Sequence, residues 1–232
     1  MSPDAGSLPV FFRHLLLLTM TTTPALADEA IGYLALGDSY TIGEAVAEDD
    51  RWPVQLAAAL RAEGIALAPP RIIATTGWTT DELSAAMDAA EPIGEYGFVS
   101  LLIGVNNQYR GRDVEEYRAQ FAALLERAIA LAGGRADRVL VLSIPDWGAT
   151  PFGQASGRDL ARVSAELDAY NAVNREESET RGVAWVDVTP VSRARGAEAA
   201  MVAEDGLHPS AAMYREWTAL ALPVARRLLS RR

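Results

Sequence analysis

A serine, an aspartate and a histidine in this chain have the types and settings of a nucleophilic site. The chain holds two histidines, and one of them, His208, follows Asp205 at three-residue spacing in the segment D-G-L-H-P. Ser39 lies far upstream, in G-D-S, directly after an apolar run. A serine hydroxyl is a poor nucleophile until a base removes its proton, and a neutral imidazole with a pKa near ~6.5 suits that task. The other histidine, His14, lies in an N-terminal stretch outside the expected folded body, so His208 is the expected base.

Such a site also needs an orienting group and a set of hydrogen-bond donors. The imidazole must have an acceptor on its other nitrogen so that the correct tautomer faces the serine, and Asp205 can fold back to supply it. Negative charge on an attacked carbonyl oxygen must be met by donors placed in advance. The natural donors are the backbone N–H groups of Ser39 and Gly77 and the side-chain amide of Asn106.

Each of these residues also has an ordinary structural interpretation. Ser39 could cap the turn after the first strand, and His208 or Asp205 could cap the last helix. Gly77 and Asn106 could be plain turn residues, with Asn106 in the left-handed conformation. A backbone carbonyl could also replace Asp205 in orienting the histidine.

The composition excludes several other kinds of chemistry. The chain has no cysteine, and each of its 21 basic residues is arginine. Thiol nucleophiles, disulfides, Schiff-base lysines and Ser–Lys pairs are therefore excluded. Two histidines without an H-E-x-x-H pattern do not predict a zinc site, and we expect neither a metal nor a cofactor. A formal net charge of −10 argues against a nucleic-acid partner.

Short apolar runs alternate with helical patterns along the chain. Strands are expected at residues 31–36, 71–74, 98–103, 139–144 and 184–188. Helices are expected at residues 52–63, 80–90, 114–132, 158–181 and 209–229, and loops at residues 145–157 and 191–205. Continuous apolar strands between helices predict parallel βαβ units. With right-handed crossovers the fold class is α/β, a three-layer α/β/α sandwich around a five-stranded parallel sheet.

This order of elements brings the candidate residues toward one edge of the sheet. Ser39, Gly77 and Asn106 each follow a strand, in successive strand-to-helix loops. Ligands of open α/β sheets bind outside the carboxyl ends of the strands. His208 stands at the beginning of the last helix, whose N-terminus can face the same edge.

The blocks around these residues resemble those of the SGNH, or GDSL-type, hydrolase family. The similar residues are Gly37-Asp38-Ser39 with Gly43 in the first block, Gly77 in the second, Gly104 to Asn107 in the third, and Asp205 and His208 in the last. The resemblance extends from residue 31 to the final helix. It implies a flavodoxin-like sandwich and metal-free ester hydrolysis, with Asp205 completing the triad. Asn107 departs from the family, whose third block usually ends in aspartate, and this puts the packing of that loop in question.

Together the residues and the resemblance predict a serine ester hydrolase that forms an acyl-enzyme on a small-molecule ester. The compact body with short loops favours small acyl groups. A carbohydrate O-deacetylase and a lysophospholipase or thioesterase are alternatives within hydrolases, and an acyltransferase would share the triad. From a different class, the alternative is a flavodoxin-like ligand-binding module.

Four further side chains lie near these loops. Trp78, Trp147 and Tyr109 are candidates to line an acyl or alcohol pocket, although single aromatic residues more often serve packing. Asp146 follows the fourth strand, where a role in the turn is favoured over contact with substrate.

The N-terminal segment has two interpretations. Residues 1–27 are either a signal peptide ending at A-L-A or the product of a misassigned start, with Met20 as the true one. Residues 28–232 are expected to form the single hydrolase domain. The balance slightly favours a cytoplasmic protein, and a cleaved leader would place it in the periplasm or outside the cell. No later stretch reaches the ~18 uninterrupted apolar residues of a membrane span, and the oligomeric state is left open.

Overall fold

The computed structural model describes Met1 and residues 30–230. Apart from Met1, the expected leader at residues 1–27 lies outside the described residues, and so does His14.

Five parallel strands form one sheet in the order β2-β1-β3-β4-β5. They are β1 (Tyr33–Gly37), β2 (Arg71–Ala74), β3 (Phe98–Leu102), β4 (Val139–Leu142) and β5 (Ala184–Val186). Every residue of β1, β3 and β4 is buried. Strands covered on both faces are apolar at nearly every position, which is why they read as apolar runs. The exception is Ser100 of β3, which forms a buried hydrogen bond with the Tyr33 hydroxyl. The predicted α/β fold with a five-stranded parallel sheet is confirmed.

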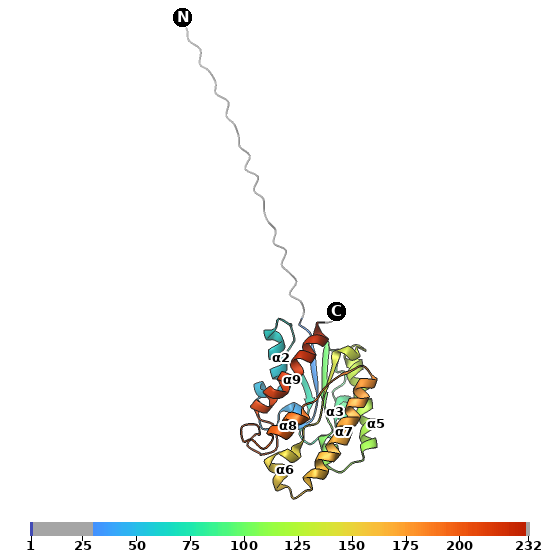
Figure 1. Cartoon of the computed structure of the whole chain (residues 1–232). Helices are drawn as coiled ribbons and strands as arrows, with labels where there is room; N and C mark the ends of the chain where they lie inside the picture. The colour runs from blue at the N-terminus through green and yellow to red at the C-terminus, as the bar shows by residue number, and fades with distance from the viewer. Residues whose placement is uncertain (2–29, 231–232) are drawn as a thin grey trace.

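Helices cover both faces of this sheet. The long ones are α2 (Trp52–Ala62), α3 (Thr80–Ala89), α5 (Val114–Leu131), α7 (Leu160–Thr180) and α9 (Ala211–Leu229). α2 packs beside α9 on one face, and α3, α5 and α7 pack together on the other (Figure 1). Within residues 30–230, none of the helices has the length and apolar character needed to cross a membrane.

The strand order has a reversal at β1 that decides where a site can form. From β1 the chain moves outward to β2, and from β2 it returns past β1 to β3 and continues to β4 and β5. Because crossovers are right-handed, the two directions place their helices on opposite faces of the sheet. The loops after β1 and β3 therefore separate, and a crevice opens between them at the carboxyl edge.

Short helices occupy several segments that were expected to be turns or loops. They are α1 (Ser39–Ile42), α4 (Val105–Tyr109), α6 (Pro151–Ala155) and α8 (Thr189–Arg195), with 3-10 turns at Glu48–Asp50, Ala136–Arg138 and Trp147–Ala149. The prediction of loops at residues 145–157 and 191–205 is thus wrong where α6 and the end of α8 lie. α6 begins with a Thr150 cap and Pro151 at its first position, which together are a helix start signal present in the sequence. α9 begins at Ala211 because Ser210 is its cap.

Candidate active site

The carboxyl ends of β1, β2 and β3 lie level, and the loops after them surround a cavity. Gly37, the last residue of β1, is in register with Ala74 of β2 and Leu102 of β3. The cavity has a volume of about 220 Å³. Its polar lining comes from Ser39, Thr76, Gly77, Asn106 and His208. Four of the five residues expected from the sequence thus share one cavity, and Asp205 lies behind His208.

Ser39 is held at the mouth of the loop after β1. It is the first residue of α1 and is 5% exposed. The helix is capped by Asp38, whose Oδ1 accepts from the Tyr40 N–H at 3.0 Å, so the interpretation of Ser39 as a cap is wrong. A Cβ on Gly37 would lie 2.4 Å from the Leu102 carbonyl oxygen, so only glycine fits there. Gly37 thus allows the close approach of the two strands, and Asp38 caps α1. The Ser39 hydroxyl forms no hydrogen bond with any described residue.

Asp205 and His208 form a rigid pair. The Nδ1 of His208 lies 2.6 Å from Asp205 Oδ2, while Oδ1 of the same carboxylate accepts the backbone N–H groups of Leu207 and His208, each at 2.9 Å. Three hydrogen bonds thus fix the carboxylate against the ring that it faces. Neither residue caps α9, because Ser210 does. With Nδ1 bonded to the carboxylate, Nε2 is the ring nitrogen left for the cavity.

The charge of Asp205 follows from the same contacts. Partial burial opposes ionisation, but the hydrogen bonds from the His208 ring and from the amides of Leu207 and His208 outweigh it, so the pKa of Asp205 is lowered. The carboxylate is therefore ionised at neutral pH and favours a proton on the Nδ1 that it faces.

Gly77 and Asn106 face the cavity from two different elements. Gly77 lies in the turn between β2 and α3 with φ +88°, a conformation that favours glycine. Asn106 lies inside the helix α4 and not in a left-handed turn, which corrects that interpretation. Its Nδ2 donates to the Trp78 carbonyl at 2.9 Å. Because an amide nitrogen carries two hydrogens, one is left for a ligand.

Asn107, the departure from the family pattern, joins α4 to α3. Its side chain is fully buried, with Oδ1 accepting from the Thr80 N–H at 3.1 Å and Nδ2 donating to Thr80 Oγ1 at 2.7 Å. The Thr80 hydroxyl in turn donates to Gln120 Oε1. Because the Thr80 hydroxyl donates its only proton to Gln120, it can only accept a hydrogen bond from residue 107. The Asn107 amide can donate that bond, whereas an ionised aspartate could not. The loop packing put in question by Asn107 is therefore intact.

Asp38 combines a structural task with an unusual charge state. It is completely buried, and its Oδ2 has no hydrogen-bond partner among the described residues. Burial raises the pKa of Asp38 to about 7, although the backbone amides of Tyr40, Gly104 and Asp38 itself act against the shift. A carboxyl group next to the candidate nucleophile therefore titrates near neutral pH, and nothing in the sequence pattern signalled it.

The remaining wall of the cavity is apolar. It is made by Tyr40, Val105, Tyr109, Trp147, Phe152 and Leu207. Of the aromatic residues singled out in the sequence, Tyr109 and Trp147 line the cavity, whereas Trp78 packs against the core. Tyr109 and Phe152 both remain more than a third exposed, at 39% and 36%. Phe152 belongs to α6, where the sequence predicted a loop, and no motif of the sequence marks it as a lining residue.

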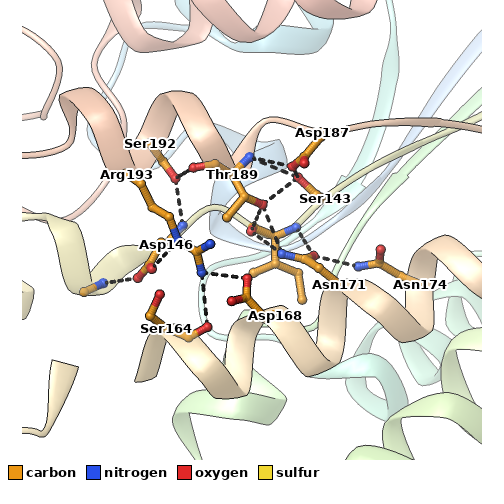
Figure 2. A network of polar contacts seen from close by, with 12 residues as sticks. Ser143, Asp146, Ser164, Asp168, Asn171, Asn174, Asp187, Thr189, Ser192 and Arg193 are labelled. Carbon is orange, nitrogen blue, oxygen red and sulfur yellow. Dashed lines mark hydrogen bonds and ion pairs between the residues drawn. The ribbon is translucent and has the colours of Figure 1, made fainter. Parts of the chain in front are cut away.

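A polar network surrounds Asp146, which caps the short turn that carries Trp147 (Figure 2). Its centre, Asp146, is 4% exposed and accepts from the Gly148 N–H and from Arg193 Nε, each at 2.9 Å. The Asp146 N–H donates to Ser192 Oγ at 2.9 Å, and Arg193 also pairs with Asp168 at 2.8 Å. Asp146 thus serves the turn, as expected, and ties the loop after β4 to α8.

Residues 30–230 contain no group of three or more His, Asp or Glu side chains placed to hold a metal ion.

Comparison with known proteins identifies a family and a shared fold. The sequence model of the GDSL-like Lipase/Acylhydrolase family matches residues 35–216. That range includes Ser39, Gly77, Asn106, Asp205 and His208. The comparison with curated proteins found no match.

Solved structures with the same fold cover nearly the whole domain. TesA is 19% identical with a TM-score of 0.67, over 85% of this chain and 99% of that one. The lipase/acylhydrolase from Enterococcus faecalis is also 19% identical, with a TM-score of 0.63 over 85% and 96%. A variant of Axe2, an acetyl xylan esterase from Geobacillus stearothermophilus, is 18% identical with a TM-score of 0.62 over 86% and 94%. At these identities the likeness concerns the fold.

Proposed function

The chain belongs to the GDSL-like lipase/acylhydrolase family and is thus an ester-hydrolysing enzyme, in which we propose that Ser39, His208 and Asp205 perform the reaction. One observation carries this proposal. The only described histidine bonds a carboxylate through Nδ1 at 2.6 Å and lines the same cavity as Ser39. A nucleophile, a base and an orienting acceptor are the three parts that acyl transfer by a serine requires.

The reaction proceeds in two halves through an acyl-enzyme. Ser39 Oγ attacks the ester carbonyl carbon while His208 Nε2 takes the hydroxyl proton. The tetrahedral intermediate then expels the alkoxide, which leaves as the alcohol with the proton from Nε2. Water attacks the acyl-enzyme in the second half, giving its proton to Nε2, and collapse returns that proton to Ser39 and releases the acid. Asp205 stabilises the imidazolium that forms in each half.

Three donors are proposed for the oxyanion of the tetrahedral intermediate. They are the N–H groups of Ser39 and Gly77 and the second hydrogen of Asn106 Nδ2. The support is that all three residues line the cavity and that the other hydrogen of the Asn106 amide is held by Trp78. Loss of one such donor costs about 10²–10³ in turnover.

The substrate is proposed to be a neutral ester with an apolar acyl group. No described Asp, Glu or Arg side chain lines the cavity, and six of its residues are apolar or aromatic. An apolar cavity of ~150 Å³ accepts a benzene molecule, and this one measures about 220 Å³. Acyl groups from acetyl to about six carbons therefore fit, which extends the small-acyl expectation.

Hydrolysis of p-nitrophenyl acetate tests the proposal. The protein should turn over this ester and be labelled at Ser39 by a serine-reactive organophosphonate, located by peptide mass spectrometry. Ser39→Ala should abolish both, while Ser84→Ala, which removes a hydroxyl on α3, should abolish neither. Undiminished turnover in Ser39→Ala would show that Ser39 is not the nucleophile.

A substrate panel separates the alternatives. Acetylated xylan, a lysophospholipid and an acyl-CoA, each compared with simple esters, distinguish a deacetylase, a lysophospholipase and a thioesterase. Added alcohol acceptors that divert product from acid to new ester would indicate an acyltransferase.

A further inference from the structure

The turn that carries Gly77 is held mainly by hydrogen bonds from side chains of other elements. Nothing lies within 4 Å of the position that a Cβ on Gly77 would take, so packing does not constrain this residue. Within the turn, the Trp78 N–H donates to the Thr75 carbonyl at 3.3 Å, at the long end for a hydrogen bond. Glycine has the widest backbone freedom of all residues. A donor that must point at an oxyanion therefore needs anchors on neighbouring elements.

Two anchors reach the turn from α4 and its end. Asn106 Nδ2 binds the Trp78 carbonyl at 2.9 Å, and Arg110 Nη2 binds the Gly77 carbonyl at 2.7 Å. Arg110 is the residue that ends α4, where its own N–H donates to the Asn106 carbonyl at 3.0 Å. The backbone that carries one proposed oxyanion donor thus binds the helix that carries another.

The guanidinium of Arg110 is itself oriented. Its Nη1 lies 3.2 Å from Glu82 Oε1, and Glu82 Oε2 accepts the Thr79 N–H at 2.8 Å in the capping box of α3. The planar fork of arginine can meet the Gly77 carbonyl and the Glu82 carboxylate together, which the single ammonium of a lysine does less well. The Gly77 carbonyl is therefore bound to a guanidinium whose orientation is set by its second bond, to Glu82.

We propose that Arg110 is a positioning residue for ester hydrolysis. By binding the Gly77 carbonyl it fixes the peptide between Gly77 and Trp78, and with it the Cα of Gly77, to which the N–H that must point at the oxyanion is attached on the other side. The inference rests on the proposed oxyanion role of Gly77. Arg110 does not line the cavity, so it acts through the turn and not on substrate. Its side chain and that of Glu82 are 43% and 40% exposed, and an ion pair so exposed adds little to stability. Loss of Arg110 is therefore expected to lower kcat and to leave the stability of the fold nearly unchanged.

A matched control lies two residues away. Arg112 Nη1 pairs with Asp81 Oδ1 at 2.6 Å, joining the same region to the same first turn of α3, but without a bond to the Gly77 turn. Arg110→Ala, Arg110→Gln, Arg110→Lys and Arg112→Ala should be compared with the wild type. The measurements are kcat and KM on p-nitrophenyl acetate, the melting temperature, and the inhibition constant of a phenylboronic acid, whose tetrahedral adduct imitates the intermediate.

The expected results separate positioning from general structure. Arg110→Ala and Arg110→Gln should lower kcat about 10- to 100-fold, as a displaced catalytic group does, and weaken boronate inhibition in parallel. KM and the melting temperature should stay near wild type, Arg110→Lys should recover part of the loss, and Arg112→Ala should match the wild type. Near-wild-type kcat in Arg110→Ala and Arg110→Gln, an equal loss in Arg112→Ala, or a change in KM alone would overturn the inference. If Ser39→Ala is inactive in the same assays, the proposed function stands whichever way Arg110 behaves.

Discussion

Asp38→Asn should stabilise the protein increasingly as the pH rises through neutrality. The change removes a buried carboxyl group but keeps its shape and the Oδ1 acceptor that caps α1 through Tyr40. Since the other oxygen, Oδ2, has no described partner, the ionised form of Asp38 is poorly compensated. Substitution therefore isolates the free-energy cost of a buried charge beside Ser39.

The magnitude follows from the shift of the pKa. Burial raises the pKa of Asp38 from 3.8 to about 7 in the folded protein. Between these values the unfolded chain has released the proton while the folded chain retains it, so the free energy of unfolding falls as pH rises. At about 1.36 kcal/mol per unit, the full cost is about 4 kcal/mol, of which about 3 kcal/mol develops between pH 5 and pH 8. Asparagine does not titrate and avoids this loss.

Urea unfolding at a series of pH values measures the effect. The difference in unfolding free energy between Asp38→Asn and the wild type should grow by about 3 kcal/mol from pH 5 to pH 8. Any constant offset from placing an amide at this position cancels in that comparison. Asp49→Asn, on an exposed surface turn, controls for the loss of one negative charge. Parallel pH curves for Asp38→Asn and the wild type would refute the reasoning, because they would mean that Asp38 is solvated or paired.

Three further changes test other parts of the site. Asp205→Asn should lower kcat for p-nitrophenyl acetate by about 10²–10⁴ without unfolding the protein, because an amide facing Nδ1 favours the wrong tautomer of His208. A loss of under threefold would mean that another group orients the ring. Arg193→Ala should destabilise the protein by about 3 kcal/mol in urea, because it strips the guanidinium from the buried Asp146 carboxylate. Adding Asp146→Asn should recover part of that loss, and an unchanged urea midpoint in Arg193→Ala would contradict the network. Phe152→Ala should lower kcat/KM for hexanoyl esters several-fold more than for acetyl esters, because it removes apolar wall at the cavity mouth; equal effects on both esters would place the acyl chain elsewhere.

The long elements were predictable because their signal is local. Five largely apolar runs correspond to the five strands, with ends that differ by two residues at most. Ile31, for example, forms only an isolated bridge with Leu67, and β1 begins at Tyr33. The five long helices were likewise visible from apolar spacing and terminal residues.

The short elements were not predictable in the same way. α1 and α4 have four and five residues, too few for a repeating pattern and too few to be stable alone. They exist because β1 and β3 deliver them to the crevice, where caps and long-range bonds hold them. Asn106 was expected in a turn for this reason, although its role as a candidate donor was recognisable from its block.

The sequence by itself determined which groups are available. The absence of cysteine and lysine, the single histidine within residues 30–230 and the order of the blocks leave few alternatives to serine chemistry on an α/β sheet. Tertiary structure alone decided how those groups behave. The 2.6 Å bond of Asp205, the raised pKa of Asp38 and the grip of Arg110 on Gly77, 33 residues apart in the chain, depend on burial and on contacts between distant segments. Such contacts form only when the sheet and helices pack, so a local residue pattern carries no record of them.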